Sequence, residues 1–307
     1  MKRTLSALAA VLTLAAALTA CSSPSSSDST SAAGSTQSAA AGSDEPVKIG
    51  VADKSQEYWR TFEKLATDAG IKVELVNFTD YTQPNPILSA GDLDLNQFQH
   101  LLYLANYNVS ADADLVPIGS TAIYQLGLYT TKGYKAPADI PDGAEIAIPN
   151  DVVNQARALL VLQSAGLISL KDGGNAFSTP AEIVTDESRV TVVPVDANQT
   201  AVQLNVLDAA VINNNFANDA GIDPTTAIYS DLQSTDAARP YLNIWAARAK
   251  DADNPVYAKL VSLYQSPEVL KELEAENGGT AVTEVVPAAQ LQKDLTGLED
   301  LVKKNQG

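Results

Sequence analysis

The feature that most constrains the fold is an alternation of short apolar strands with amphipathic helices, which occurs twice along the chain. The first run opens with a strand predicted at residues 47–51, a helix at residues 57–69 and an alternating strand at residues 71–78. It continues to about Ile118, and a second run of the same kind begins at Glu145. This alternation is typical of βαβ units around a largely parallel sheet. The sequence therefore predicts an α/β protein with two lobes of ordinary domain size.

Two extended segments link the predicted lobes. Residues 127–131 and 241–246 are predicted as strands that cross between the lobes, and the C-terminal helices would return to the first lobe. We expect a first lobe made of residues 46–128 and 243–307 and a second lobe made of residues 129–242. Open α/β sheets bind ligands beyond the carboxyl ends of their strands, so a cleft between the lobes is the natural site. Closure about the crossing strands would be a hinge motion.

The N-terminus carries the pattern of a lipoprotein signal. Lys2 and Arg3 precede an apolar stretch at residues 5–18, and the only cysteine of the chain, Cys21, follows two small residues. The apolar stretch is shorter than the roughly 20 residues that a membrane-spanning helix needs. We expect residues 1–20 to be a signal peptide and Cys21 to receive the lipid. The alternative is an ordinary secretion signal with a cysteine at its edge by chance.

The segment after the expected signal predicts a tether. Residues 21–45 are rich in Ser, Ala, Thr and Gly and, after Cys21, contain no aromatic residue and no Val, Ile or Leu, so they cannot bury enough apolar surface to fold. The folded protein would begin near Pro46 and be held on the extracytoplasmic face of the cell membrane by more than one acyl chain. Loss of Lys2 and Arg3 with the signal would change the formal net charge from −17 to −19. Such a charge argues against nucleic acid as a partner.

The sequence offers little for an enzyme or a metal site. His100 is the only histidine, which leaves at most one imidazole base. No nucleophile elbow, dinucleotide-binding turn or phosphate-binding loop is present. Residues 92–96 resemble the start of a calcium loop, but Gln97 stands where glycine is required and Tyr103 where glutamate is required; the segment fits a half-buried strand better. We therefore expect no catalytic residues, no metal and no cofactor.

Polar and aromatic residues gather in four segments at predicted strand ends or helix starts. These are Asp80-Tyr81, residues 96–103, residues 149–157 and residues 211–216. Phe98 and His100 face the same side if their segment is extended, and Asn154 and Arg157 share one face of a predicted helix. Asn213 stands at the exit of an apolar strand, and Asn214 and Asn215 are expected to be turn or helix-start residues. Convergence of these segments would build a recognition site.

The same segments contain phrases of a known protein family. The matching phrases are Asp80-Tyr81 with Pro84-Asn85, residues 91–94, Phe98-Gln99-His100, residues 147–151, residues 154–160, residues 166–173, residues 210–213, residues 240–243 and residues 264–266. Spread over roughly residues 47–282, they resemble the methionine-binding lipoproteins of the MetQ/NlpA type, which are the substrate-binding subunits of methionine ABC importers. The resemblance implies a two-lobed periplasmic-binding-protein fold, type II-like, with two crossing hinge strands. It also implies methionine as ligand and an ABC permease as partner.

The chemistry of the candidate residues agrees with an amino-acid ligand. Arg157 can clamp a carboxylate with two parallel hydrogen bonds. Asn154 and Asn213 can offer amide oxygens to an ammonium or amide hydrogens to a carboxylate. The expected wall for an apolar side chain is formed by Tyr81, Phe98 and His100, and Tyr103 is expected to contact the ligand as well. Tyr124 fits the site and the core equally well.

Departures from the family's usual phrases leave the ligand open. Val152-Val153 stand where Pro-Thr is common, Ala156 where glycine is usual and Gln125 where proline is common, and residues 53–59 are bulkier than expected. Methionine is therefore weighed against another amino acid and against a methionine-containing dipeptide. Two other roles remain as alternatives, a surface adhesin or sensor with a vestigial cleft and a secreted enzyme that uses the same fold.

Overall fold

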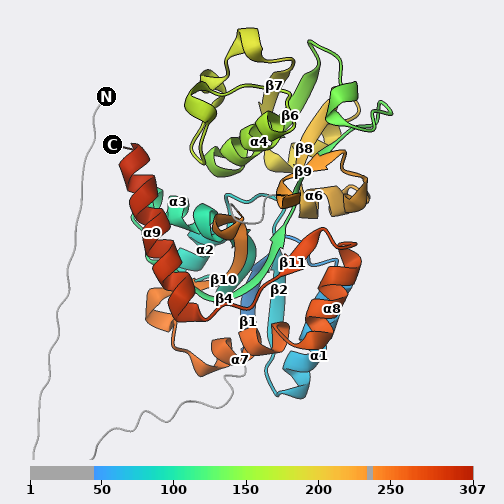
Figure 1. Cartoon of the computed structure of the whole chain (residues 1–307). Coiled ribbons are helices and arrows are strands. Elements are labelled where there is room, and N and C mark those ends of the chain that lie inside the picture. Colours follow the sequence, from blue (N-terminus) through green and yellow to red (C-terminus); the bar gives the residue numbers. More distant parts are fainter. Residues whose placement is uncertain (1–44, 234–237, 307) are drawn as a thin grey trace, which may run out of the picture. The chain divides into compact units, whose positions relative to one another are not determined.

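The described strands of the computed structural model form two sheets, each covered by helices to make one lobe (Figure 1). The structure describes residues 45–233 and 238–306, so the expected signal peptide, Cys21 and nearly all of the tether lie outside the described residues. Within the described part of the chain, no helix is both long and apolar enough to cross a membrane. The two-lobed α/β prediction is confirmed.

The first lobe is built on a mixed sheet. Its strand order is β11 (Ala281–Thr283), β4 (Leu115–Tyr124), β10 (Leu242–Arg248), β3 (Leu95–His100), β1 (Val47–Val51) and β2 (Val73–Asn77). Only β2, β1 and β3 are parallel, whereas β10 runs antiparallel to both β3 and β4. The expected largely parallel sheet is therefore parallel only at one edge. The reason is that β10 follows the second lobe in the chain and enters the sheet from the opposite end.

The second lobe has a smaller sheet of the same kind. Its order is β7 (Thr191–Val195), β6 (Glu145–Pro149), β8 (Ala209–Asn213), β5 (Leu126–Tyr129) and β9 (Tyr229–Ser230). Strand β6 is parallel to β7 and β8, and β5 pairs antiparallel with β8 and β9. The helices of this lobe are α4 (Val152–Ser164), α5 (Thr200–Gln203) and α6 (Asn214–Asp219).

Helices cover both faces of the first sheet and set its two cores. The helices are α1 (Glu57–Asp68), α7 (Pro255–Tyr264) and α8 (Pro267–Glu276) on one face, and α2 (Pro84–Ala90), α3 (Leu101–Ala111) and α9 (Ala288–Gln306) on the other. The α1 face is aromatic, with the rings of Trp59, Phe62, Trp245 and Tyr264 packed at centroid distances of 5.1 to 6.0 Å. The second lobe has a largely aliphatic core around β6, β8 and α4.

The chain crosses to the second lobe at Gln125, the residue between β4 and β5. Its buried side-chain amide donates hydrogen bonds to the Pro224 carbonyl at 2.6 Å and to the Tyr129 hydroxyl at 3.1 Å. The backbone N–H of Leu126 donates to Asp231 at 2.9 Å. This crossing is therefore fixed by polar contacts from the second lobe.

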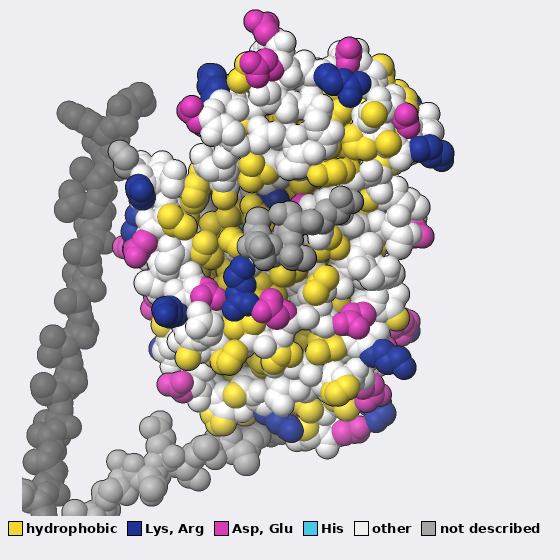
Figure 2. Space-filling model, in the orientation of Figure 1, with side chains coloured by type: hydrophobic (Ala, Val, Ile, Leu, Met, Phe, Trp, Pro, Cys, Tyr) yellow, Lys and Arg dark blue, Asp and Glu magenta, His cyan; other side chains and the backbone are white. Residues whose placement is uncertain are grey.

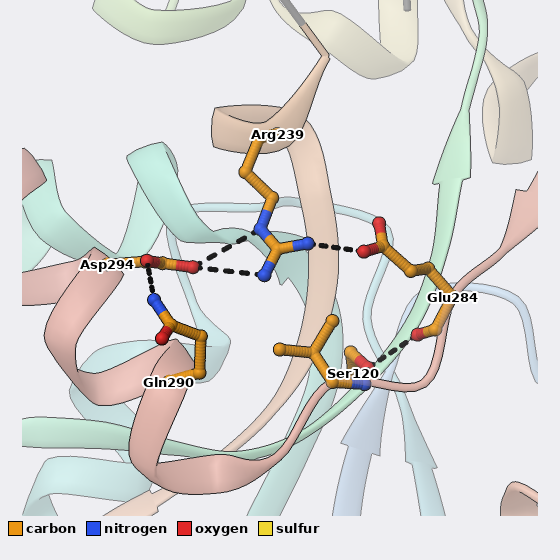
Figure 3. A network of polar contacts seen from close by, with 6 residues as sticks. Ser120, Arg239, Glu284, Gln290 and Asp294 are labelled. Carbon is orange, nitrogen blue, oxygen red and sulfur yellow. Dashed lines mark hydrogen bonds and ion pairs between the residues drawn. The ribbon is translucent and has the colours of Figure 1, made fainter. Parts of the chain in front are cut away.

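The return crossing is anchored to the first lobe at Arg239 (Figure 3). Its guanidinium donates to Asp294 of α9 at 3.2 Å and to Glu284, which follows β11. Gln290 donates to the same Asp294 at 2.6 Å, and Ser120 of β4 donates to the Glu284 carbonyl at 2.5 Å. The network ties the start of the return segment to three elements of the first lobe.

Charged side chains of both signs lie on the surface of the protein. On the face drawn in Figure 2, acidic and basic side chains are interspersed, and hydrophobic side chains gather between the lobes. A phosphate backbone would require a continuous basic surface, which this mixed face does not provide.

Candidate ligand-binding site

One cavity lies between the lobes, beyond the carboxyl ends of β1 and β3 and against the start of α4 and the end of β8. All seven residues predicted as ligand contacts line it. They are Tyr81, Phe98, His100 and Tyr103 from the first lobe and Asn154, Arg157 and Asn213 from the second. The structure thus brings together residues that are up to 132 positions apart in the chain, between Tyr81 and Asn213. Tyr124 lines the cavity as well.

Aromatic side chains form one wall of the cavity. The ring centroids of Tyr81, Phe98 and Tyr103 lie 5.9 to 6.2 Å apart, in tilted or edge-to-face arrangements. The Tyr103 hydroxyl donates to the Tyr81 carbonyl at 3.2 Å, and the Tyr81 hydroxyl donates to Asn215 of the other lobe. Phe216 of the second lobe packs on Tyr81 at 4.8 Å between centroids. Both lobes therefore shape the apolar end of the site.

The Phe-Gln-His phrase is positioned by the end of β3. The pairing of β3 with β10 shifts register at Phe98, because Gln97 pairs with Trp245 and Gln99 with Ile244, so side chains do not simply alternate here. Gln99 is buried, whereas Phe98 and His100 line the cavity. The Gln99 amide donates to Asn85 of α2 at 2.6 Å, which fixes the strand end against that helix. His100 then caps α3, since its Nδ1 accepts from the Tyr103 N–H at 3.2 Å.

Arg157 projects from α4 into the cavity and is held there by contacts within the protein. Its Nε donates to Asp231 at 2.6 Å and its Nη2 donates to the Tyr124 carbonyl at 2.8 Å, while its carbon Cζ lies 4.3 Å above the ring of Tyr241. The side chain is 5% exposed. These contacts use only part of the guanidinium's N–H donors, so the remainder can bind a carboxylate.

The amides beside Arg157 form a connected set. Asp151 caps α4 by accepting from the Asn154 backbone N–H at 2.9 Å. The Asn154 side-chain oxygen accepts from Asn213 at 3.1 Å and lies 3.5 Å from the His100 Nε2. The Asn213 side-chain oxygen is buried and has no partner among the described residues. An unpaired buried acceptor is costly, and a ligand ammonium would satisfy it.

His100 is electrically neutral in this site. Burial, together with the nearby positive charge of Arg157, lowers its pKa to about 3. Because Nδ1 accepts from a backbone N–H, the ring proton lies on Nε2, which faces the Asn154 oxygen. The histidine therefore acts as a neutral donor and as part of the wall.

The structure matches known proteins along most of its length. The family model described as NlpA lipoprotein covers residues 47–286. The chain belongs to the NlpA lipoprotein family. The resemblance to the MetQ/NlpA type is confirmed.

Relatives of this NlpA family member include named binding proteins. The chain is 35% identical to the D-methionine-binding lipoprotein MetQ of Escherichia coli, over 78% of this chain and 90% of that protein. It is 37% identical to outer membrane lipoprotein 2 of Mannheimia haemolytica, over 76% of this chain and 84% of that protein. A solved nutrient-binding protein from Burkholderia cenocepacia, bound to methionine, is 40% identical with a TM-score of 0.71, and the match covers 78% of this chain and 99% of that one.

Several residues in or beside the cavity of this NlpA family chain were not predicted from the sequence. Asp231 begins a short 3-10 helix with no motif around it, and it contacts Arg157 without lining the cavity itself. Phe216 packs on Tyr81 and follows Asn214 and Asn215, which were expected to be turn or helix-start residues. Asn214 and Asn215 also line the cavity, as do Asp53 and Gln97. The polar phrase at the exit of β8 was a usable signal for Phe216; no local signal marked Asp231.

The described residues contain no group of three or more His, Cys, Asp or Glu side chains able to hold a metal ion. Residues 92–96, which resemble the start of a calcium loop, form the turn before β3 and the first two residues of that strand. The strand therefore begins at Leu95, later than expected.

Proposed function

We propose that this protein captures methionine in the cavity between its lobes and delivers it to the permease of an ABC importer. The observation that carries the proposal is that the buried guanidinium of Arg157 keeps free N–H donors. It lines the same cavity as the aromatic wall and the unpaired amide oxygen of Asn213. The methionine named in the descriptions of the relatives has the groups that such a site would bind. The protein is a carrier and not an enzyme.

The three parts of the ligand have separate partners. Its carboxylate would bind Arg157, and its ammonium would bind the free oxygen of Asn213. Its thioether would contact Tyr81, Phe98 and Tyr103, and each sulfur–aromatic contact contributes about 0.3–1.5 kcal/mol. Burial of the side chain adds roughly 1.5–3 kcal/mol, and micromolar affinity requires about 8 kcal/mol in total. Charged hydrogen bonds can supply the difference.

Contacts between the lobes support capture by closure. Asn198 of the second lobe donates to the Thr79 carbonyl of the first at 2.8 Å, and Asn214 donates to Thr280 at 3.3 Å. These bonds would break when the lobes rotate apart about the two crossings. We place the lobe boundaries at Gln125 and close to Leu242, near the expected residues 128 and 242.

The location follows from the family and from the N-terminal pattern. We propose that Cys21 carries the lipid, that residues 1–20 are removed as the signal and that residues 21–45 tether the folded lobes outside the membrane. A tether of this length would reach roughly 27 Å as a flexible coil, which allows contact with a membrane-embedded permease. Mass spectrometry of the N-terminal peptide would detect the acyl chains, and an unmodified Cys21 would contradict the anchor.

Calorimetric titration tests the ligand. The full-length protein in detergent, freed of ligand by unfolding and refolding, would be titrated with L-methionine, D-methionine and a panel of other amino acids. We expect saturable one-to-one binding of methionine and a loss of about 3–5 kcal/mol in Arg157→Ala, because the carboxylate would be left buried and unpaired. Arg189→Ala is the matched control, since Arg189 pairs with Asp142 at 2.7 Å on the surface of the same lobe.

Each result has a defined meaning. Binding of another amino acid in place of methionine would keep the transport role and change the substrate. A folded protein that binds none of the titrants would refute the proposal and favour an adhesin or sensor. Turnover of the ligand on mixing would favour an enzyme.

A further inference from the structure

Helix α4 begins with two valines that have opposite surroundings. Val152 is 62% exposed, whereas Val153 is 3% exposed. Neither side chain lines the ligand cavity. The burial of Val153 therefore has a cause other than the ligand site.

The surface that buries Val153 belongs to the first lobe. Its side chain is part of the apolar cluster that α2, α3 and α9 form on the first sheet, and the other buried members come from that lobe and from Tyr241 at the return crossing. Helices α3 and α4 are in contact across the lobe boundary (Figure 1). Other side chains of α4, such as Leu159 and Leu162, face the core of their own lobe. Val153 is thus a second-lobe residue that is buried by the first lobe.

Val153 stands on the face of α4 that carries Arg157, because residues four apart in a helix share a face. Asn154 follows it directly, and both Asn154 and Arg157 line the cavity. Across the boundary, α3 starts at Leu101, directly after His100, whose Nε2 lies 3.5 Å from the Asn154 side-chain oxygen. Contact of Val153 with the first lobe therefore fixes the first turn of α4 at the point where Asn154 meets His100.

A contact of the same kind runs in the opposite direction. Tyr81 of the first lobe packs against the apolar cluster of the second lobe, with its ring centroid 4.8 Å from that of Phe216. Tyr81 also lines the cavity, so its substitution would change the ligand contacts and the closure together. Val153 has no contact with the cavity, which makes it the clearer reporter of closure.

We propose that Val153 is a positioning residue, which docks on the first lobe when the cavity closes and stabilises the closed form without touching the ligand. The inference rests on the proposed function, because it concerns the closure that captures the ligand. Separation of the lobes would expose this side chain to water, so its burial stabilises the closed form only. Closed lobes retain the ligand, and the contact therefore slows release.

Paired substitutions test the proposal. Val153→Ala is compared with Val152→Ala, which makes the same change one residue earlier in the same helix turn, where the side chain is exposed. Both variants would be made in the full-length protein, freed of ligand and titrated with methionine in detergent. We expect the Kd of Val153→Ala to rise about five- to twentyfold, as the loss of two buried methyl groups from the closed form predicts. The Kd of Val152→Ala should stay within about twofold of the wild type.

Kinetics and stability separate closure from ordinary core packing. Release of radiolabelled methionine from Val153→Ala should accelerate about five- to twentyfold, while the association rate changes less than about twofold, because the ligand enters the open form. Urea unfolding of the ligand-free proteins should give the same midpoint for Val153→Ala and Val152→Ala. A side chain that belongs to the permanent core of one lobe would instead lower the midpoint.

The outcomes distinguish this inference from the proposed function. Equal affinities of the two variants would overturn the inference, as would a loss of ligand-free stability in Val153→Ala as large as its loss of binding. Methionine binding by the wild type would leave the proposed function intact in either case. If another amino acid binds in place of methionine, it serves as titrant in the same comparison. If the wild type binds none of the titrants, the proposed function and this inference both fail.

Discussion

Each lobe contributes one charged side chain to the cavity, the buried Arg157 and the half-buried Asp53, and the two charges are handled in opposite ways. Arg157 of the second lobe is paired with Asp231 and hydrogen-bonded to a backbone carbonyl at the hinge. Asp53 of the first lobe has hydrogen bonds from Tyr58 and Trp59 but no cation. The clamp of the second lobe is therefore held by contacts within the protein, whereas the carboxylate of the first lobe has no ion-pair partner among the described residues. Paired and unpaired charges respond differently to mutation and to pH, which makes the contrast testable.

The largest effect concerns the unpaired charge. With its pKa raised to about 6, Asp53 binds a proton more tightly in the folded than in the unfolded chain, so its contribution to stability falls as pH rises from about 4 to about 6. The stability of Asp53→Asn relative to the wild type should therefore increase by about 2–3 kcal/mol between pH 4 and pH 7. Urea unfolding of the ligand-free proteins, followed by tryptophan fluorescence, measures this difference. A difference that does not vary with pH would mean that Asp53 is compensated.

The next effect concerns the paired charge. Asp231→Asn keeps an acceptor but removes the charge that holds the Arg157 guanidinium, and we expect methionine affinity to fall by about 1.5–3 kcal/mol. Calorimetry measures the loss. Asp142→Asn, which removes the exposed partner of Arg189, should leave affinity unchanged. Undiminished binding in Asp231→Asn would show that Arg157 does not need its partner.

A smaller loss of affinity is expected for a substitution in the aromatic wall than for one at a charged residue. Phe98→Leu keeps apolar bulk but removes one ring, so methionine should lose about 0.3–1.5 kcal/mol of binding and its isostere norleucine, which has no sulfur, should lose less. Comparative titration with the two ligands gives the difference. Equal losses would mean that the ring provides bulk only.

The smallest effect is expected at His100. Because its pKa is lowered to about 3, the ring stays neutral between about pH 5 and pH 8. Methionine affinity of the wild type and of His100→Gln should therefore follow parallel pH profiles over that range, within about twofold. Profiles that diverge around pH 6.5 would show that the histidine titrates in the site.

The sequence was sufficient for the fold class and for the seven predicted ligand contacts, all of which line the cavity. Strand and helix periodicity predicted two lobes, and the quoted phrases identified residues that the structure brings into one cavity. Periodicity was less informative for boundaries: the third strand was expected at residues 92–96 and lies at Leu95–His100. Alternation of leucine with aspartate gave a strand signal in a turn. That turn is held instead by hydrogen bonds to β1, such as the one that the Lys48 N–H donates to the Asp94 carboxylate at 2.9 Å.

Residues that act through long-range pairing could not be predicted. Asp231 is 74 positions from Arg157, and nothing in its own segment distinguishes it from the other acids of the chain. Asp53 was noted only as part of a bulky start to the first helix. Its character depends on burial beside Tyr58 and Trp59, and burial of a polar side chain is a property of the assembled fold.

The hydrogen bond from Arg157 to the Tyr124 carbonyl has a kinetic consequence. Tyr124 is the last residue of β4 before the crossing, so rotation of the lobes would displace the atom that Arg157 grips. Loss of the ligand carboxylate and opening of the hinge would then be a single event. The residence time of the ligand would equal the waiting time for opening, and a permease that pulls the lobes apart would release its cargo in the same movement.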